Sequence, residues 1–386
     1  MIQLPFLFFL FAFVGGQIFS VSFGSGVRVS LLDIAVAVFV FVNVIRMNIQ
    51  PVQVKMWLKS FGPFIAVALL SLILHLFTLP LRDLTISSLY LIRFGLYAAI
   101  VLVISGESKA NKQRYLIGLW SGGVAIGLLG LMQYFLYPNL RNLAYLGWDP
   151  HEFRLFSTLL DPNFAAIILV LTLILSTQMI QHKNTLWRKF VIVASGLCLV
   201  ALLLTYSRGG YLAFGGALIY WALLNKKIKE MLLVGLFFGS ALLILPRPGG
   251  EGVNLLRTMS IGSRLKNSQE AIEIFAKSPI IGVGFDTLRF IRGQTEIVVG
   301  TGELSHSGAG FHNSFLFILA TTGIIGLLSY VWLWKSVLRE AYKSGQIELI
   351  ILSLVAVSVH SLFDNSLFFP AAMLWLWVIA GVNANS

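Results

Sequence analysis

The chain has 386 residues, of which 57% are hydrophobic and only 11% are charged. A soluble domain carries about a quarter charged residues, so this composition excludes a soluble enzyme. So high an apolar content also excludes a disordered chain. The net charge of +12 could indicate nucleic acid, but the positions of the basic residues indicate lipid instead. We therefore predict a membrane protein with no nucleic-acid partner.

Runs of about 20 mostly apolar residues, the length that crosses a bilayer, recur along the chain. The first run lacks the basic start of a signal peptide and is interpreted as a retained span. Twelve spans are predicted, at residues 4–23, 29–45, 61–78, 84–104, 115–137, 163–181, 190–206, 211–224, 231–245, 314–334, 347–363 and 367–382.

Basic residues alternate between the two sides of these spans. If the N-terminus is cytoplasmic, five cytoplasmic loops hold three basic residues each: Arg46, Lys55, Lys59; Lys109, Lys112, Arg114; Lys183, Arg188, Lys189; Lys226, Lys227, Lys229; and Lys335, Arg339, Lys343. The short outer loops hold one or two each: Arg28, Arg82, Arg141, Arg154 and Arg208. This pattern follows the positive-inside rule. It predicts a single membrane domain, residues 1–386, in the inner (plasma) membrane with both termini cytoplasmic.

Residues 246–313 form a long extracytoplasmic loop between the ninth and tenth predicted spans. Apolar residues at helical spacing predict a helix over 263–277, and Ser278-Pro279 ends it because the residue before proline avoids helical geometry. Residues 280–284 are expected to turn the chain, and residues 300–310 to be mobile. Long loops with structure of their own are usually functional, so we expect the active-site elements here.

Two outer arginines are candidates for binding phosphate. Arg208 lies in a tight turn after the seventh span, and its guanidinium fork suits phosphate, although an arginine that snorkels to the interface fits as well. Arg264 opens the predicted loop helix directly after Ser263. A helix N-terminus favours anions, so a cation at this point indicates an anion bound beside it.

Further candidates lie at the re-entry into the membrane and inside it. His312 and its neighbour Asn313 mark the outer end of the tenth span. His312 is interpreted as a general base or as a hydrogen-bond donor to phosphate. Arg93 interrupts the fourth span, where a charge is costly and suggests a functional site. Arg93 is expected either to reach substrate or to pair with an acid.

Other polar residues are given structural interpretations. His75 and His360 lie within spans and are expected to pack or form hydrogen bonds. Asp161 precedes Pro162 and is expected to cap the sixth span, with catalysis as the lesser alternative. The single cysteine, Cys198, excludes an intrachain disulfide. There is no nucleotide-binding loop and no zinc-type spacing, so neither a metal nor another cofactor is expected.

Four motifs in a fixed order resemble the O-antigen ligase and polymerase superfamily. The similarity covers about residues 150 to 335. The motifs are Ser207-Arg208-Gly209-Gly210; Gly262-Ser263-Arg264 with a helix leading into Lys277-Ser278-Pro279-Ile280-Ile281-Gly282-Val283-Gly284; His312-Asn313-Ser314-Phe315-Leu316; and Thr322-Gly323-Ile324-Ile325-Gly326-Leu327.

The resemblance implies an all-α polytopic glycosyltransferase of GT-C-like type. Its donor would be a glycan on undecaprenyl diphosphate at the outer leaflet, and its acceptor a glycan or lipid A core hydroxyl that attacks with inversion. It also implies that Arg208, Arg264 and His312 are the essential residues and that no metal is needed. Ser263 and Asn313 are added as candidates for binding substrate, together with Arg93, which no motif of the superfamily supports.

The acceptor, and even the class of protein, remain open from the sequence. A ligase acting on lipid A core, a polysaccharide polymerase and a protein O-glycosyltransferase all fit. A ligase is favoured because polymerases of cell-surface polysaccharide are often more divergent in sequence than this chain. An anion transporter of the bicarbonate type is the main alternative class, but it would be expected to show matching broken helices in its two halves. A flippase would need charged groups lining both leaflets.

Overall fold

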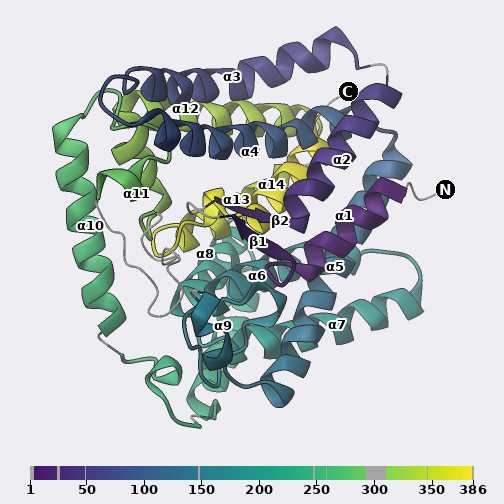
Figure 1. Cartoon of the computed structure of the whole chain (residues 1–386). Coiled ribbons are helices and arrows are strands. Elements are labelled where there is room, and N and C mark those ends of the chain that lie inside the picture. Colours follow the sequence, from purple (N-terminus) through teal and green to yellow (C-terminus); the bar gives the residue numbers. More distant parts are fainter. Residues whose placement is uncertain are drawn as a thin grey trace.

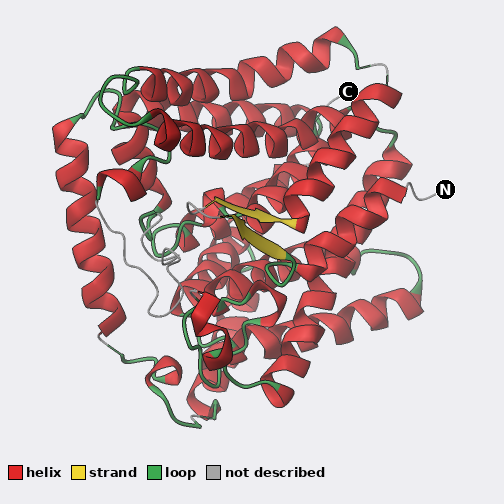
Figure 2. Cartoon of the chain, viewed as in Figure 1, coloured by secondary structure: helices red, strands yellow, loops and turns green. Residues whose placement is uncertain are grey.

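The computed structural model describes residues 4–23, 27–47, 49–146, 148–246, 248–257, 259–292, 310–345 and 347–384. Helices make up nearly all of its regular structure (Figures 1 and 2). The predicted mobile stretch 300–310 lies outside the described residues except for Gly310. The predicted all-α class is confirmed, with one small hairpin as an addition.

A helix lies in each of the twelve predicted ranges. These helices are α1 (Leu4–Gly15), α2 (Leu31–Arg46), α3 (Pro51–Ile73), α4 (Leu81–Ser105), α5 (Lys109–Leu136), α6 (Pro162–Met179), α7 (Thr185–Leu204), α8 (Arg208–Asn225), α9 (Ile228–Ile244), α12 (Ser314–Lys343), α13 (Ile347–His360) and α14 (Pro370–Asn383). Six of the described helices are long and apolar enough to cross a membrane: α3, α4, α5, α6, α7 and α12. The chain is a multi-pass membrane protein, and the number twelve stays a prediction.

The first predicted span, residues 4–23, is wrong in its second half. Helix α1 ends at Gly15, and Gly16 takes a φ of +56°, a left-handed conformation that glycine adopts without strain. The chain then forms strand β1 (Ser20–Phe23), which pairs antiparallel with β2 (Val27–Ser30). Ser30 and Asp33 form a capping box that starts α2. Strand β1 of this hairpin therefore takes the place of the last residues of the expected span.

Helix α14 lies at the centre of the bundle (Figure 1). Its residues from Ala371 to Asn383 are all buried, and it packs mainly against α4, with further contacts to α5 and α13. Trp377 stacks on Trp334 of α12 with ring centroids 4.8 Å apart. The C-terminal helix α14 is therefore an interior element of the bundle. Helices α3, α4 and α12 lie side by side along one edge of the bundle.

The loop helix α10 (Met259–Lys277) stands along the edge of the molecule and packs against α12 (Figure 1). It begins four residues before the predicted start at Ser263, so Arg264 is its sixth residue. The argument that Arg264 sits at a helix N-terminus is therefore wrong. A short helix α11 (Leu288–Ile291) follows, and 3-10 turns occupy Arg141–Leu146, Ser157–Leu159, Glu251–Val253 and Ser366–Phe368.

Helix α12 is broken at Gly323, which takes φ +66° and ψ −168°. The loop after α10 fills the break with backbone hydrogen bonds: Ile324 N donates to Pro279 O at 2.9 Å and Val283 N to Ala320 O at 3.0 Å. Backbone groups inside a membrane protein must be satisfied internally, and the loop meets this need. The helix in the predicted span 314–334 therefore contains a break, which the sequence analysis did not predict. Residues 280–284 lie against this break as well as turning the chain.

Candidate active site

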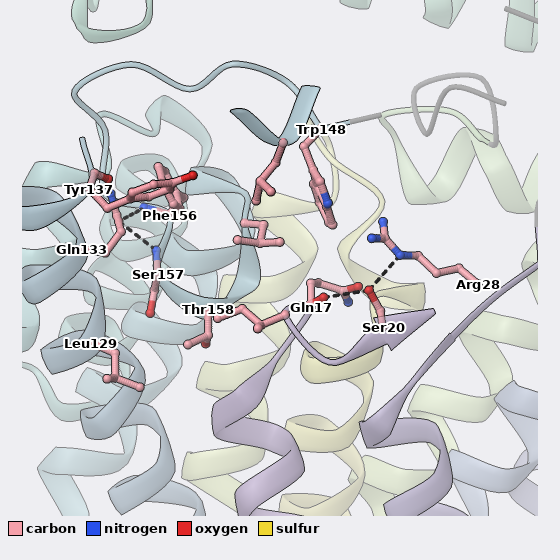
Figure 3. A pocket seen from close by; sticks show the side chains of 13 residues that line it. Gln17, Ser20, Arg28, Leu129, Gln133, Tyr137, Trp148, Phe156, Ser157 and Thr158 are labelled. Carbon is pink, nitrogen blue, oxygen red and sulfur yellow. Dashed lines mark hydrogen bonds between the residues drawn. The ribbon is translucent and has the colours of Figure 1, made fainter. Parts of the chain in front are cut away.

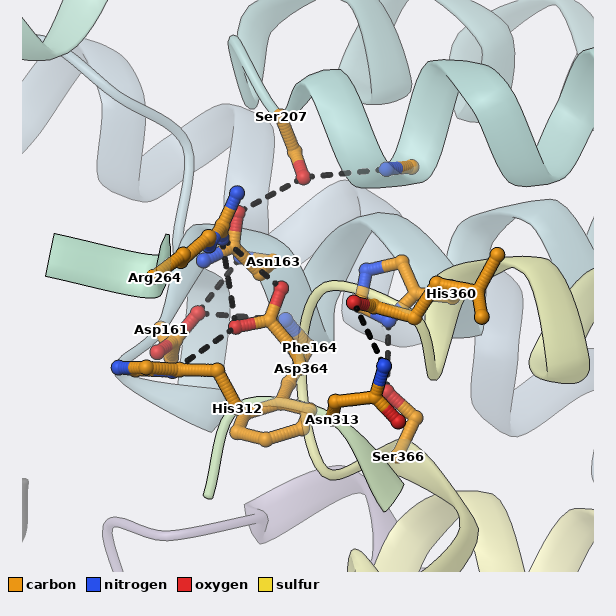
Figure 4. A network of polar contacts seen from close by, with 12 residues as sticks. Asp161, Asn163, Phe164, Ser207, Arg264, His312, Asn313, His360, Asp364 and Ser366 are labelled. Carbon is orange, nitrogen blue, oxygen red and sulfur yellow. Dashed lines mark hydrogen bonds and ion pairs between the residues drawn. The ribbon is translucent and has the colours of Figure 1, made fainter. Parts of the chain in front are cut away.

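Asp364 joins two of the predicted site residues. Its Oδ2 and Oδ1 accept from Arg264 Nη2 at 3.3 and 3.5 Å, and its Oδ1 lies 3.7 Å from His312 Nδ1 (Figure 4). The Asp364 side chain is only 8% exposed, whereas His312 is 45% exposed. The buried carboxylate is therefore neutralised by a guanidinium on one side and lies beside an accessible imidazole on the other.

The ends of several helices bring these groups together. Asp364 follows α13, Arg264 lies on α10, and His312 immediately precedes the cap of α12. The backbone N–H of His312 donates to Asn267 Oδ1 at 2.9 Å, which ties the histidine to the helix that carries Arg264. The predicted topology places the starts of α6, α8 and α12 and the end of α13 on one side of the membrane, and the structure gathers them at one site.

Arg208 lies beside this group at the first residue of α8. Its Nη1 donates to the carbonyl oxygens of Arg257 at 3.0 Å and Leu255 at 3.4 Å, so it holds the chain that leads into α10. Partial burial, followed by the charge of Arg264, lowers the pKa of the Arg208 guanidinium. The two guanidinium groups are close enough to repel one another, and an anion between them would relieve this.

Asp161 caps α6, as predicted. Its Oδ1 accepts from the backbone N–H of Asn163 at 2.6 Å and of Phe164 at 3.3 Å. Burial, and then the neighbouring Asp364 carboxylate, raise the pKa of Asp161, which places this cap next to the site. Ser207, the cap of α8, donates to Asn163 Oδ1 at 2.8 Å (Figure 4). The starts of α6 and α8 are therefore linked directly.

A buried arginine holds the turn in front of Arg208. Arg154 donates from Nε to Thr205 O at 2.9 Å and from Nη2 to Tyr206 O at 3.4 Å. Burial, followed by the charge of Arg257, lowers the pKa of Arg154 to about 10, so it stays protonated at neutral pH. Among the described residues, four arginines, Arg154, Arg208, Arg257 and Arg264, thus lie around the acids Asp161 and Asp364, and this concentration of positive charge favours an anion.

The remaining predicted site residues have local partners. Asn313 caps α12, with Oδ1 accepting from Phe315 N and Leu316 N, and its Nδ2 donates to Leu362 O at 3.3 Å. Ser263 is exposed on α10, one residue before Arg264. The buried His360 bonds through Nδ1 to Ser366 Oγ at 2.6 Å, and His75 bonds to Ser71 O. Both histidines therefore form hydrogen bonds, as predicted.

Arg93 belongs to a different cluster. It donates from Nη2 to Asp33 Oδ2 at 2.9 Å and to the carbonyl oxygen of Arg28, and its guanidinium lies over the ring of Tyr90. Tyr97 donates to the other oxygen of Asp33 at 2.9 Å. The structure thus confirms pairing with an acid, one of the two alternatives for Arg93. Its contact with substrate stays a prediction.

Asp286 is a buried acid near this cluster and gives a test of stability against pH. Burial raises its pKa to about 7, with Arg289 and Arg93 opposing the shift. An unfolded aspartate ionises near pH 4, so stability is highest below that value and falls as pH rises to about 7. Asp286→Asn should therefore gain about 2 to 3 kcal/mol relative to wild type between pH 5 and pH 8. Its φ of +58° suits asparagine.

Melting curves of the two proteins at several pH values measure this difference. Glu273→Gln, a substitution of an exposed acid on α10, serves as the control and should show no such trend. An Asp286→Asn difference that is constant from pH 5 to pH 8 would contradict the raised pKa.

The sequence analysis gives Asp364 no role, because this residue falls between the predicted spans 347–363 and 367–382. A signal was present: a lone acid four residues after His360, at the outer mouth of a predicted span, is costly unless paired. Its partners come from residues 312 and 264, too distant in sequence for spacing to reveal them. Among the described residues, no group of three or more His, Cys, Asp or Glu side chains could hold a metal, and metal independence stays a prediction.

Comparisons with known proteins cover the part of the chain that carries these residues. The family model described as O-antigen ligase matches residues 193–331, a range that contains Arg208, Arg264 and His312. The O-antigen ligase of Salmonella typhimurium is 27% identical over 319 residues, covering 76% of this chain and 75% of the relative. The protein is thus a membrane enzyme of the glycosyltransferase type. Its sequence is similar to the O-antigen ligase superfamily over these ranges.

Proposed function

We propose that the chain is a ligase-type glycosyltransferase of cell-surface polysaccharide biosynthesis. It moves a glycan from undecaprenyl diphosphate to an acceptor hydroxyl at the outer leaflet of the inner membrane, with inversion and without a metal. The observation that carries the proposal is the meeting of Arg264 and His312 on the buried Asp364. Arg208 lies alongside them, and both termini are assigned to the cytoplasm.

The reaction forms one bond and breaks one. The acceptor oxygen bonds to the anomeric carbon as the bond from that carbon to the diphosphate oxygen breaks, and the electron pair leaves with the diphosphate. Arg264 and Arg208 would stabilise this growing negative charge, as preorganised donors do in a site shielded from water. Their guanidinium forks match the paired oxygens of phosphate.

His312 would take the proton of the acceptor hydroxyl. Asp364 stands 3.7 Å from its Nδ1, so the carboxylate can orient the ring and stabilise the imidazolium that forms. Contacts of this kind often tighten only when substrate is bound. In the alternative role, His312 donates a hydrogen bond to the diphosphate. This role predicts that removal of the imidazole ring weakens binding of the lipid-linked glycan. General base catalysis predicts instead that removal of the ring abolishes glycan transfer and leaves binding of the lipid-linked glycan unchanged.

The lipid A core is the acceptor that we favour, because the matching relative is named as an O-antigen ligase. A polymerase that joins glycan repeats is the second candidate. An anion transporter has less support, since the helix break at Gly323 of α12 has no counterpart among the described helices of the amino-terminal half. Transporters usually carry matched breaks in both halves.

Purified protein with a polyprenyl-diphosphate-linked glycan and a mixture of candidate acceptors tests the proposal. We expect free polyprenyl diphosphate to be released and one glycan to be added per acceptor, with no change on addition of a chelator. A ladder of products would indicate the polymerase. His312→Ala should lose transfer and retain donor binding. Absence of release with every acceptor, together with anion uptake into liposomes, would assign the chain to the transporters.

Arg208→Lys is expected to lower the transfer rate by about 10- to 100-fold, because an ammonium keeps the charge but loses the planar fork. The fork also holds the carbonyl oxygens of Leu255 and Arg257, so the approach of α10 to the site should loosen. Initial rates at saturating donor measure the effect. Arg188→Lys, at an exposed position in the first turn of α7, is the control. Equal activity of both variants would remove Arg208 from the site.

A further inference from the structure

A cavity of about 470 Å³ lies between the β-hairpin, the outer end of α5 and residues 156–160 (Figure 3). Its size is that of a typical small-molecule pocket. None of the predicted site residues lines it. Leu160 lines the cavity, however, and the next residue is Asp161, the cap of α6 beside Asp364. The cavity is thus separate from the active site but shares a segment of backbone with it.

The polar side chains of the cavity wall are mostly committed to the protein itself. Gln133 accepts through Oε1 from the backbone of Phe156 and Ser157 and donates through Nε2 to Tyr137 O. Ser157 Oγ donates to Ile126 O at 2.6 Å. Thr158 Oγ1, buried without a hydrogen-bond partner among the described residues, adds one hydroxyl. Because most of these polar groups are already bonded within the protein, and Ile18, Leu129, Leu143, Phe156 and Leu160 supply apolar surface, the wall favours hydrocarbon.

The surroundings of the cavity face lipid. On the last turns of α5, Phe135 is 75% and Leu136 is 77% exposed, and Met132 is also exposed. Ile18, which lines the cavity, and Phe19 beside it are exposed as well. The predicted topology puts this end of α5 at the outer leaflet. A lipid chain can therefore enter the cavity from the bilayer without crossing water.

A cation, Arg28, lines the cavity. The Arg28 guanidinium lies over the ring of Trp148, 4.3 Å from its centroid, and Arg28 Nε donates to Ser20 Oγ at 3.0 Å (Figure 3). Trp and Arg are typical of the head-group region, and a guanidinium suits a single phosphate. The preferred ligand is therefore an amphiphile with a hydrocarbon chain and an anionic head.

We propose that this cavity binds one acyl chain of an anionic phospholipid of the outer leaflet, with its phosphate against Arg28. Its place next to Leu160 means that the bound lipid supports the segment that ends at Asp161. The polyprenyl-diphosphate-linked glycan donor is a poorer match for this cavity, because the arginines that would bind its diphosphate lie in the candidate active site around Asp364. The site requires only that the chain is a membrane protein, so it stands independently of the proposed reaction.

Cross-linking in nanodiscs tests the site. The full chain is reconstituted with phosphatidylglycerol that carries a photoreactive group in its acyl chain, irradiated, digested and examined by mass spectrometry. We expect adducts on the peptides that contain Leu129 and residues 156–160. Leu129→Trp, which fills the cavity, should reduce these adducts about tenfold because the chain loses the burial of several methylene groups. Ile18→Trp fills it from the hairpin side, should Leu129→Trp not fold.

Matched controls separate the cavity from general contact with lipid. Leu128→Trp changes the neighbouring exposed residue of α5, which does not line the cavity, and should leave the adducts unchanged. Diacylglycerol with the same photoreactive chain should label several-fold less than phosphatidylglycerol. Arg28→Gln should remove that preference, whereas Arg82→Gln, at an exposed outer position, should keep it.

Two outcomes would overturn the proposal. Equal labelling of the Leu129→Trp and Leu128→Trp proteins would mean that no chain occupies the cavity. Labelling of the cavity peptides by a photoreactive polyprenyl diphosphate and not by phosphatidylglycerol would assign the space to the donor tail. Neither readout depends on glycan transfer, so failure of this proposal is distinguishable from failure of the proposed enzymatic function.

Discussion

Arg264→Ala is expected to lower glycan transfer by about a thousandfold while the protein still folds and inserts. Removal of one preorganised donor from a site that stabilises developing negative charge costs about 10²- to 10³-fold in rate. Arg264 also neutralises the buried Asp364, so its loss disturbs the carboxylate that lies beside His312. Single-turnover transfer from a polyprenyl-diphosphate-linked glycan measures the effect, and the melting temperature reports on folding.

Lys266→Ala is the matched control, since Lys266 is an exposed basic residue two positions along the same helix. It should transfer at the wild-type rate. Asp364→Asn should be strongly impaired alone but add little in the Arg264→Ala background, because residues that act through one contact are not additive. Transfer by Arg264→Ala within about twofold of wild type would exclude Arg264 from the site.

Gly323→Ala is expected to prevent formation of the folded protein. A Cβ on Gly323 would lie 2.2 Å from the carbonyl oxygen of Ile280, and the φ of +66° with ψ of −168° is almost restricted to glycine. Gly282 faces the same contact, where a Cβ would lie 2.3 Å from the Thr321 carbonyl carbon. Clash and strain together should exceed about 4 kcal/mol, the range of severe substitutions.

Yield of monodisperse protein and its melting temperature test this expectation. Gly215→Ala is the control, because a Cβ at that helical position meets nothing within 4 Å. It should be neutral or slightly stabilising, since alanine favours helix over glycine by about 1 kcal/mol. If Gly323→Ala melted like Gly215→Ala, the close contact between the loop and the broken helix would be absent from the protein.

Sequence patterns anticipated much of the fold. A run of apolar residues predicts a membrane helix because lipid offers no partner for backbone groups, and a helix was found in each predicted range. Local caps were equally readable, as Asp161 at the start of α6 demonstrates. Errors arose where local conformation was decided by one residue. Gly16 ended α1 early, and α10 began at Met259, four residues before the predicted start at Ser263.

The site itself was only partly predictable. Arg208, Arg264 and His312 were singled out from residue type and position. The structure brings them together, with Arg208 at the start of α8, His312 before the start of α12 and Arg264 on α10. The reason given for Arg264 was wrong, because its anionic partner is Asp364 and not a ligand at a helix N-terminus. Arg93 looked similar in the sequence but pairs with Asp33 in another cluster. An isolated charge reveals that a partner is needed without revealing which one.

The sequence by itself determined that this protein is a helical membrane protein, which residues carry charge near the outer surface, and to which superfamily those residues are similar. These properties depend on composition and short-range spacing. Only the tertiary structure decided that Asp364 joins Arg264 to His312, that the loop after α10 fills the break in α12, and that a cavity lies beside Leu160. Each of these unites segments far apart in the chain, and such contacts are set by the packing of helices, which local sequence patterns do not encode.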